Sequence, residues 1–254
     1  VLGAAIATLI AQAVSAVLVT VTLMYRTEGM KLCLSQIRMY KRMLQSILKI
    51  GLPAGFEAIM YSISNIIVQV SINNFGVDTM AAWTAYSKID FIFWMINSAF
   101  GISVMTFVGQ NYGAGKWDRI RRGTKICLGM ALISAVSVSI ILMSAERFLF
   151  GIFVNDAGVV EIGIRMMNVI APAYLLFAFI EVFSGALRAQ GAVVVSTLIT
   201  MVGICVLRMI WVTLVAAHGT LEQVIICYPI TWAAGALAMS IYYIYKQRKI
   251  FQAR

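Results

Sequence analysis

The sequence predicts an all-α protein, a polytopic transmembrane helix bundle with about seven spans. Of its 254 residues, 61% are hydrophobic and only 12% are charged, whereas about a quarter of the residues in an ordinary soluble domain are charged. A helix needs about 20 apolar residues to cross the hydrocarbon core of a bilayer. Stretches of that length run roughly from 1 to 25, 47 to 74, 80 to 108, 123 to 145, 161 to 187, 192 to 216 and 221 to 245.

Short turns separate most of these stretches, and they contain the Gly, Asn and Asp residues that favour turns. The turns lie at 73–78, 109–116, 155–158, 190–191 and 218–220. The first stretch opens on Val1, without a Met and without a basic leader. We therefore expect a fragment of a longer chain and no signal peptide.

Basic residues predict how the spans are oriented. Lys and Arg concentrate in 26–49, in 116–125, at Arg188 and in the C-terminal tail, which lie on one side if the spans alternate. The positive-inside rule makes that side cytoplasmic. We therefore expect loops 26–46 and 109–122 and the C-terminus to be cytoplasmic, in a multi-pass protein of the cell (inner or plasma) membrane.

The net charge of +10 does not require a nucleic-acid partner. The basic clusters flank predicted spans and lack the interleaved aromatic residues of a nucleic-acid-binding surface. Contacts with anionic membrane lipids explain them more simply. No metal site is predicted either, because His218 is the sole histidine and the four cysteines form no Cys-x-x-Cys pair.

Prolines and charged residues interrupt the apolar stretches. Gly51 and Pro53 open the second stretch and Pro172 lies within the fifth, where they are interpreted either as hinges of a moving helix or as static kinks. Glu57 and Asp90 fall near mid-membrane at about 1.5 Å of rise per residue. A charged side chain at that depth is costly in lipid, so we expect both to face the interior of the bundle.

Two interpretations of these carboxyl groups remain open. In the first, Glu57 and Asp90 line a water-accessible cavity where a proton or cation competes with a positively charged ligand. In the second, Asp90 forms a permanent ion pair with Arg208, which is expected at a similar depth. Lys88 lies two residues before Asp90 on a different helix face, and we expect Lys88 and Arg208 to be structural ion-pair partners.

Further polar residues are candidates for the same interior. Glu181, seven residues before Arg188, is interpreted as another cavity acid or as an inner-gate partner of the basic loops. The alternative is a carboxylate that snorkels or is capped by a neighbouring helix. Three polar residues follow Glu57 at four-residue steps and form one stripe that faces protein or water. With two others they make up the predicted cavity wall: Tyr61, Asn65, Gln69, Asn97 and Tyr174.

Four short motifs in this order resemble those of multidrug and toxic compound extrusion (MATE) transporters. They are GLPAG at 51–55, AAWTAY at 81–86, FVGQNYGAGK at 107–116 and GALRAQG at 185–191. Each motif alone is weak, and their order and spacing together carry the resemblance. Ala189 stands where the family more often has glycine, and Tyr61 stands where some members carry an acidic residue.

The resemblance covers about residues 47 to 245 and implies both a fold and an activity. It implies residues 1–25 as the last helix of a missing first lobe, 26–46 as a basic cytoplasmic linker, 47–245 as a six-helix C-terminal lobe and 246–254 as a cytoplasmic tail. The implied activity is export of organic, often cationic, compounds by antiport with sodium ions or protons, through alternating access between two lobes. The coupling ion is the sole cofactor implied, and Glu57, Asp90 and Glu181 are the candidates for binding it or the substrate.

Two other classes compete with this interpretation. A lipid-linked saccharide flippase would share a helical lobe, but its groove should be rich in Arg and Lys at the midplane, where this sequence offers Lys88 and Arg208 alone. An intramembrane enzyme would need facing His, Asp or Ser residues, and the sequence lacks Asp-x-x-Asp and Gly-x-Ser-x-Gly patterns. We therefore expect a transporter and not an enzyme.

Overall fold

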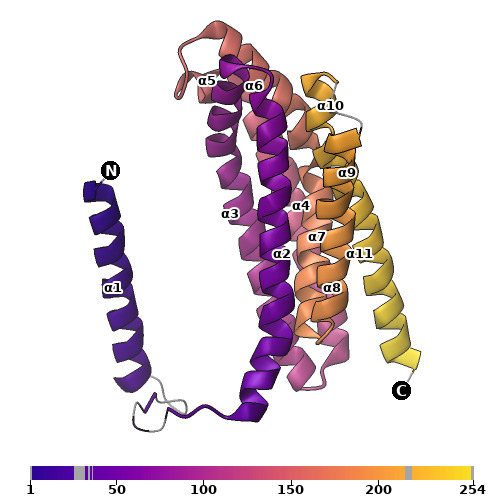
Figure 1. Cartoon of the computed structure of the whole chain (residues 1–254). Helices are drawn as coiled ribbons and strands as arrows, with labels where there is room; N and C mark the ends of the chain where they lie inside the picture. Colours follow the sequence, from indigo (N-terminus) through magenta and orange to yellow (C-terminus); the bar gives the residue numbers. More distant parts are fainter. Residues whose placement is uncertain (1, 26–31, 34, 36, 215–218, 253–254) are drawn as a thin grey trace. The chain divides into compact units, whose positions relative to one another are not determined.

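The computed structural model describes residues 2–25, 32–33, 35, 37–214 and 219–252. These residues are helical apart from turns and short connections, and seven helical segments are long and apolar enough to cross a membrane. This confirms the predicted fold class (Figure 1). The chain divides into two compact units, residues 1–48 and 49–254.

The first unit contains α1 (Leu2–Tyr25) and the start of α2 (Lys41–Asn73). The side chains of α1 that the structure describes are all exposed or half-buried. Such a helix has no packed face of its own and is suited to lipid or to another protein surface. Its assignment to another lobe remains a prediction.

The second unit is a bundle of helices that follow one another with short connections (Figure 1). After α2 come α3 (Val77–Gly113), α4 (Trp117–Ser144), α5 (Glu146–Gly151), α6 (Ala157–Ile170), the 3-10 turn η2 (Ala171–Ala173), α7 (Tyr174–Ala189), α8 (Val193–Thr200), the π-helical segment η3 (Met201–Val206), α9 (Leu207–Leu214), α10 (Leu221–Ile225) and α11 (Cys227–Gln252).

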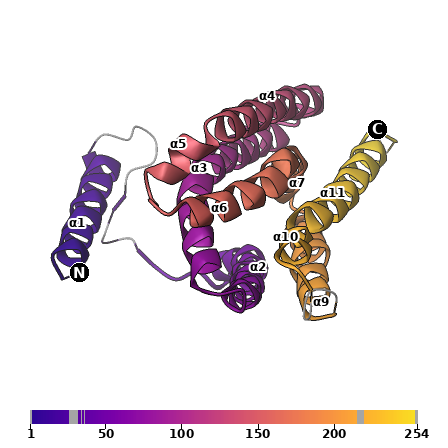
Figure 2. The same cartoon turned by 90° about the horizontal axis from the view of Figure 1, so that it is seen from above.

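Helix α7 forms the core of this unit. It contacts α3, α4, α8 and α11, and the α6–α7 segment lies between α3 and α4 on one side and α11 on the other (Figure 2). The six consecutive residues 182–187 are buried, so this part of the helix packs on every face. A Cβ on Gly185 would lie 2.8 Å from the carbonyl oxygen of Gly101. The two glycines therefore allow α7 and α3 to cross at backbone contact.

Several helices extend beyond their predicted ends. Helix α2 begins at Lys41, within the expected linker, and α3 continues through Gly113, which leaves a three-residue turn where Gly115 has φ +68°. Helix α11 runs to Gln252 and includes most of the expected tail. The predicted ends marked where apolar composition stops, whereas Lys, Arg and Gln are good helix formers that continue a helix into the polar region.

The prolines lie at different places in the helical framework. Pro53 is inside the continuous helix α2, and Pro172 lies in η2, the 3-10 turn that joins α6 to α7. A 3-10 turn accommodates the missing N–H of proline without ending the span. Gly51 has open space beside its Cα, because a Cβ at this position would meet no neighbouring atom within 4 Å. The hinge roles of Gly51, Pro53 and Pro172 stay predictions.

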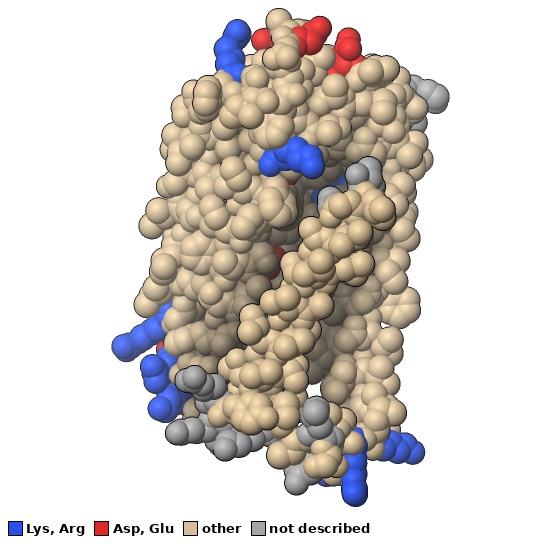
Figure 3. Space-filling model, turned by 90° about the vertical axis from the view of Figure 1, so that its left-hand side faces the viewer, with Lys and Arg blue, Asp and Glu red and all other residues tan. Residues whose placement is uncertain are grey.

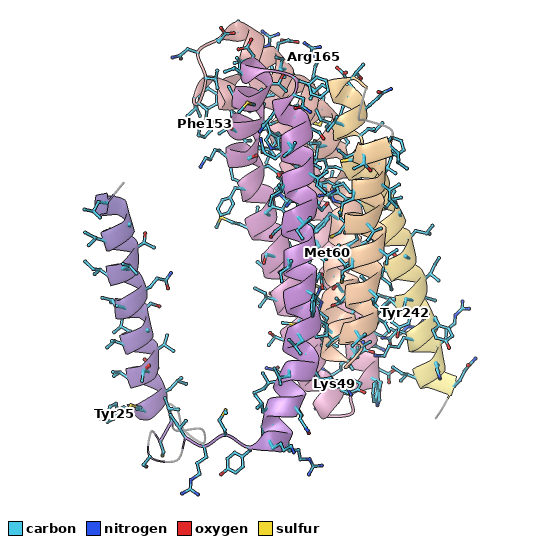
Figure 4. The ribbon with its side chains drawn as sticks, in the orientation of Figure 1. Tyr25, Lys49, Met60, Phe153, Arg165 and Tyr242 are labelled. Carbon is cyan, nitrogen blue, oxygen red and sulfur yellow. The ribbon has the colours of Figure 1, made fainter. Side chains whose placement is uncertain are left out.

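The two ends of the second unit differ in charge. Lys49 and Tyr242 lie toward one end, and Phe153 and Arg165 lie toward the other (Figure 4). On the face drawn in Figure 3, most visible Asp and Glu side chains gather at the upper end. In the second unit, Lys116, Arg119 and Arg121 lie in or just after the turn between α3 and α4, at the opposite end. At the upper end Arg165 pairs with Glu222 at 3.9 Å, and this exposed pair adds little stability.

Candidate functional site

A cavity of about 380 Å³, here called cavity 1, lies in the second unit. Residues of α2, α3, α6 and α11 line it, and aromatic side chains make up more than half of the lining: Tyr61, Trp83, Tyr86, Phe91, Trp94, Tyr228 and Trp232. The rings contact one another, with Trp83 stacked on Tyr86 at 5.4 Å between centroids and Trp94 edge-on to Trp232 at 6.1 Å. Cavity 1 is therefore an aromatic chamber with few polar groups.

Asp90 supplies the carboxylate of cavity 1. Trp94 Nε1 donates to its Oδ2 at 2.5 Å, and the Tyr174 hydroxyl donates to its Oδ1. Tyr174 is in turn 3.1 Å from the Tyr86 hydroxyl and stacks on Phe93 with 3.9 Å between ring centroids. These contacts hold the carboxylate at the wall of the chamber, so Asp90 is half-buried and not sealed off.

The predicted ion pair between Asp90 and Arg208 is wrong. Arg208 is completely buried and donates from Nη1 to Asn65 Oδ1 at 2.9 Å, while its Cζ lies 4.3 Å from the centroid of the Tyr228 ring. The aromatic ring and the amide oxygen take the place of a carboxylate around the guanidinium. Because Trp94 and Tyr174 already occupy the two oxygens of Asp90, that carboxylate has its own partners.

Lys88 is not an ion-pair partner either. Its side chain is exposed on α3 and forms no salt bridge with the residues that the structure describes. The reason is its position two residues before Asp90, which turns the two side chains to different helix faces.

A further cavity of about 330 Å³, here called cavity 2, brings together Glu57, Glu181 and Arg188. Tyr61 lines both cavities and therefore stands between them. The expected cavity acids thus fall into two groups, with Asp90 in cavity 1 and Glu57 and Glu181 in cavity 2. This differs from a single site shared by Glu57 and Asp90.

Glu57 forms the most extensive polar network of cavity 2. Arg188 Nη2 lies 2.7 Å from both carboxylate oxygens, and Thr197 Oγ1 donates to Oε2 at 2.9 Å. Arg188 Nε also donates to Ser184 Oγ at 3.0 Å. Three helices, α2, α7 and α8, meet in this network. Arg188 was not among the predicted site residues, although the GALRAQG motif that contains it was a signal.

Glu181 lies on the same cavity but outside that hydrogen-bond network. Its side chain packs over Gly101, where a built Cβ would overlap the carboxyl group. The carboxyl group of Glu181 thus occupies the space that a side chain at position 101 would take. Its carboxylate is close enough to Arg188 and Glu57 to interact with both electrostatically, so cavity 2 holds two carboxylates and one guanidinium.

The other predicted wall residues are divided. Tyr61, Asn65 and Gln69 line cavity 1, as their spacing along α2 suggested. Tyr174 is buried and holds Asp90 from behind the wall. Asn97 is buried at 4% exposure and lines neither cavity 1 nor cavity 2, so it is not a wall residue of these cavities. Helix α3 turns it into the core of the bundle.

Comparison with known proteins decides the family. The MatE family model matches residues 53–214, which is more than half of the chain. The chain belongs to the MATE family. It is a multi-pass membrane protein of a transporter family and not an enzyme.

The MATE chain is similar to several bacterial relatives. It is 25% identical over 219 residues to the probable multidrug resistance protein YoeA of Bacillus subtilis, which covers 84% of this chain and 47% of the relative. It is 23% identical over 230 residues to the multidrug export protein MepA of Staphylococcus saprophyticus, which covers 85% of this chain and 51% of the relative. The chain thus spans about half the length of these relatives.

A solved structure shows the same fold. An outward-facing multidrug resistance MATE family transporter superimposes with a TM-score of 0.89 at 18% identity, over 98% of this chain and 57% of the other. All residues that line cavity 2 lie within the range matched by the MatE model. Helix α2, which contributes Glu57 and Tyr61, begins before that range. Cavity 1 also uses Tyr228 and Trp232 of α11, beyond the matched residues.

Proposed function

We propose that the protein exports organic, often cationic, compounds from the cell by antiport with sodium ions or protons. The observation that carries this proposal is the pair of neighbouring cavities, each with its own carboxylate, on either side of Tyr61. The relatives YoeA and MepA are named as a probable multidrug resistance protein and a multidrug export protein, which supports the proposal.

Cavity 1 is proposed to hold the organic cation. Rings attract a cation through the negative face of their π-systems, and a desolvated site strengthens that attraction. Trp83, Tyr86 and Trp94 offer such faces beside the Asp90 carboxylate. A volume of about 380 Å³ is within the range of small-molecule sites.

Cavity 2 is proposed to hold the coupling ion. Its two carboxylates, Glu57 and Glu181, face a single guanidinium, that of Arg188, so the group carries one negative charge in excess when both acids are ionised. A proton or a sodium ion neutralises that charge. Because Tyr61 contacts both cavities, occupancy of one can change the shape of the other.

The flippase alternative lacks support from the site. Its groove would need several cationic side chains facing the cavity, whereas in the described residues Arg208 is buried behind the wall and Lys88 is exposed outside it. The walls of cavity 1 are aromatic with an acid, which suits a positive ligand and not a row of phosphates.

The proposed function also requires a membrane location, an orientation and a second lobe. We propose that it lies in the cell membrane with loops 26–46 and 109–122 and the C-terminus in the cytoplasm, by the positive-inside bias. We also propose that α1 is the last helix of another lobe and that alternating access occurs between the two lobes. Membrane lipids then contact the basic ends of the helices.

Transport by purified, full-length protein in proteoliposomes tests the function. Accumulation of the fluorescent cation ethidium would be followed after imposing an inward sodium gradient, an inward proton gradient, or neither. Counterflow of the dye in response to one of the gradients is the expected result. Dye movement that ignores both gradients, or no movement under either, would contradict the proposed antiport.

A further inference from the structure

A further cavity, of about 370 Å³, lies between α3 and α4. These two helices pack against each other and lie side by side (Figure 2). The cavity shares no residue with cavity 1 or cavity 2. We call it the α3–α4 groove, and its main lining residues are apolar: Phe100, Val104, Phe107, Ile126, Cys127 and Met130.

The α3–α4 groove opens on the surface of the bundle. Ile126 and Met130 line it and are more than half exposed. The ring of Phe107 lies over Gly123, where a built Cβ would overlap it, and the Cys127 thiol already donates to the backbone oxygen of Phe100 at 3.7 Å. Because the exposed apolar surface of a membrane protein meets hydrocarbon, the groove suits an apolar chain.

Two arginines continue the α4 side of the groove toward the α3–α4 turn. Arg119 lies four residues before Gly123, and Arg122 lies four residues before Ile126. Each arginine is therefore one turn, about 5.4 Å, beyond a lining residue on the same helix face. Both are exposed, and neither forms a salt bridge with the residues that the structure describes. The neighbouring Asp118 is turned about 100° away from Arg119.

Aromatic side chains indicate the depth of this end of the groove in the membrane. Tyr112, near the end of α3, packs edge-on against Trp117, the first residue of α4, with 4.9 Å between ring centroids. Trp and Tyr are enriched at the level of the lipid headgroups. Arg119 and Arg122 follow Trp117 within two helical turns, so they also lie near the headgroups, and the groove extends from them toward the hydrocarbon core.

We propose that the α3–α4 groove binds an anionic phospholipid. One acyl chain lies against Phe107, Ile126 and Met130, and the phosphate accepts hydrogen bonds from Arg119 and Arg122. Charge complementarity favours an anionic lipid, because a zwitterionic headgroup brings its own positive charge to the two arginines. The bound lipid contacts both helices and holds α3 against α4. This inference does not depend on the proposed antiport.

Lipid affinity is measured by native mass spectrometry of the full-length protein. Dioleoyl phosphatidylglycerol and dioleoyl phosphatidylcholine have the same chains and differ in headgroup charge, and the readout is the dissociation constant of the first bound lipid. We expect phosphatidylglycerol to bind at least about fivefold more tightly, because one basic residue near an anionic lipid contributes about that factor.

A double substitution tests the two arginines. Arg119→Gln with Arg122→Gln should bring the two dissociation constants within about twofold of each other, because the headgroup contacts are then lost. The matched control is Arg248→Gln with Lys249→Gln, which removes two exposed charges from α11 at the same end of the bundle. This control should keep the preference for phosphatidylglycerol.

Photo-crosslinking locates the bound chain. Phosphatidylglycerol with a diazirine in one acyl chain is irradiated with the full-length protein in nanodiscs, and labelled peptides are identified by mass spectrometry. We expect the label on residues 100–107 and 123–130. Ser103→Phe places a ring at an exposed lining residue and should reduce this labelling severalfold, whereas Thr84→Phe places the same ring on α3 outside the groove and should not.

Three results would overturn the inference: equal affinity for the two lipids, equal effects of the two double substitutions, or a label spread evenly over the apolar surface. Absence of label from both groove segments would also overturn it, because another protein surface then covers the groove. Neither readout involves transport, so failure of the lipid site leaves the proposed antiport to its own test.

Discussion

Arg188 on α7 places its Nη2 2.7 Å from both carboxylate oxygens of Glu57 on α2. The side chains are 27% and 14% exposed, so the pair is shielded but still in contact with cavity 2. A partly shielded pair of this kind stabilises the contact between its two helices more than a surface salt bridge does. Its disruption should therefore alter both stability and transport.

The pair should show measurable coupling in stability. Arg188→Gln leaves a Glu57 carboxylate with Thr197 as its remaining hydrogen-bond donor, and we expect a loss of about 1–3 kcal/mol. Glu57→Gln should cost less than Arg188→Gln, because the amide oxygen still accepts from Arg188. Thermal unfolding of the two single variants and the double variant measures the coupling. Additive single effects would show that the pair contributes nothing.

The proposed roles of the acids predict a loss of export without a loss of protein. Glu57→Gln and Asp90→Asn should each abolish gradient-driven dye export while the protein is expressed and purified in normal amounts. Asp90→Asn should also weaken dye binding, because cavity 1 loses its carboxylate. Uptake into proteoliposomes and anisotropy separate the two effects. Export at the normal rate by both variants would exclude these acids from coupling.

Tyr174→Phe tests how Asp90 is held. The substitution removes the hydroxyl that donates to Asp90 and keeps the ring stacked on Phe93. We expect a loss of about 1 kcal/mol in stability and weaker cation binding, since the carboxylate is freed from one of its supports. Phe183→Leu, which trims a ring on the same helix that stacks on Tyr243, is the comparison. Similar binding by Tyr174→Phe and the unaltered protein would show that the hydroxyl has no role in positioning.

Glu181→Gln distinguishes a coupling acid from a packing residue. Export by the unaltered protein should respond either to external pH or to external sodium, and the variant should lose that response while still binding dye. Rates measured at raised and lowered external pH, and then at raised and lowered sodium, give the comparison. An unchanged response would favour the alternative in which Glu181 is merely capped within the bundle.

Close helix packing at Gly185 predicts a steric effect on stability. A Cβ there would lie 2.8 Å from Gly101 O and from Val104 Cγ1, and overpacking of this kind costs about 1–3 kcal/mol. Gly185→Ala should therefore lower the unfolding temperature. Gly129→Ala on α4 is the control, because a built Cβ there meets nothing within 4 Å, and it should be neutral or slightly stabilising. Equal effects would contradict the close approach.

The fold was predictable because a long apolar run has few alternatives in a membrane. The spans and the stripe of Tyr61, Asn65 and Gln69 follow from composition and helical spacing alone. The partners of Arg208 were not predictable, because which helix faces which depends on tertiary packing. Depth along the membrane normal suggested Asp90, whereas the structure pairs Arg208 with Asn65. Residue spacing within a helix predicts how deep a side chain lies in the membrane. It does not predict which neighbouring helix that side chain faces.

The same limit explains cavity 2. The sequence separates Glu57 from Arg188 by 131 positions, and no spacing rule joins residues on α2 and α7. The GALRAQG motif marked Arg188 as notable without naming its partner. Residues that work through close backbone approach, such as Gly101 beneath Glu181, carry no local signal beyond being glycine.

The π-helical segment Met201–Val206 has a geometric consequence for both chambers. Thr197 before it reaches Glu57, and Arg208 after it reaches Asn65. In an unbroken α-helix these two residues, about three full turns apart, would point the same way. The extra residue of a wide turn rotates the second by about 100°. The same helical segment thereby reaches two sites that face different directions. Deletion of one residue from the π-helical turn would rotate Arg208 away from Asn65.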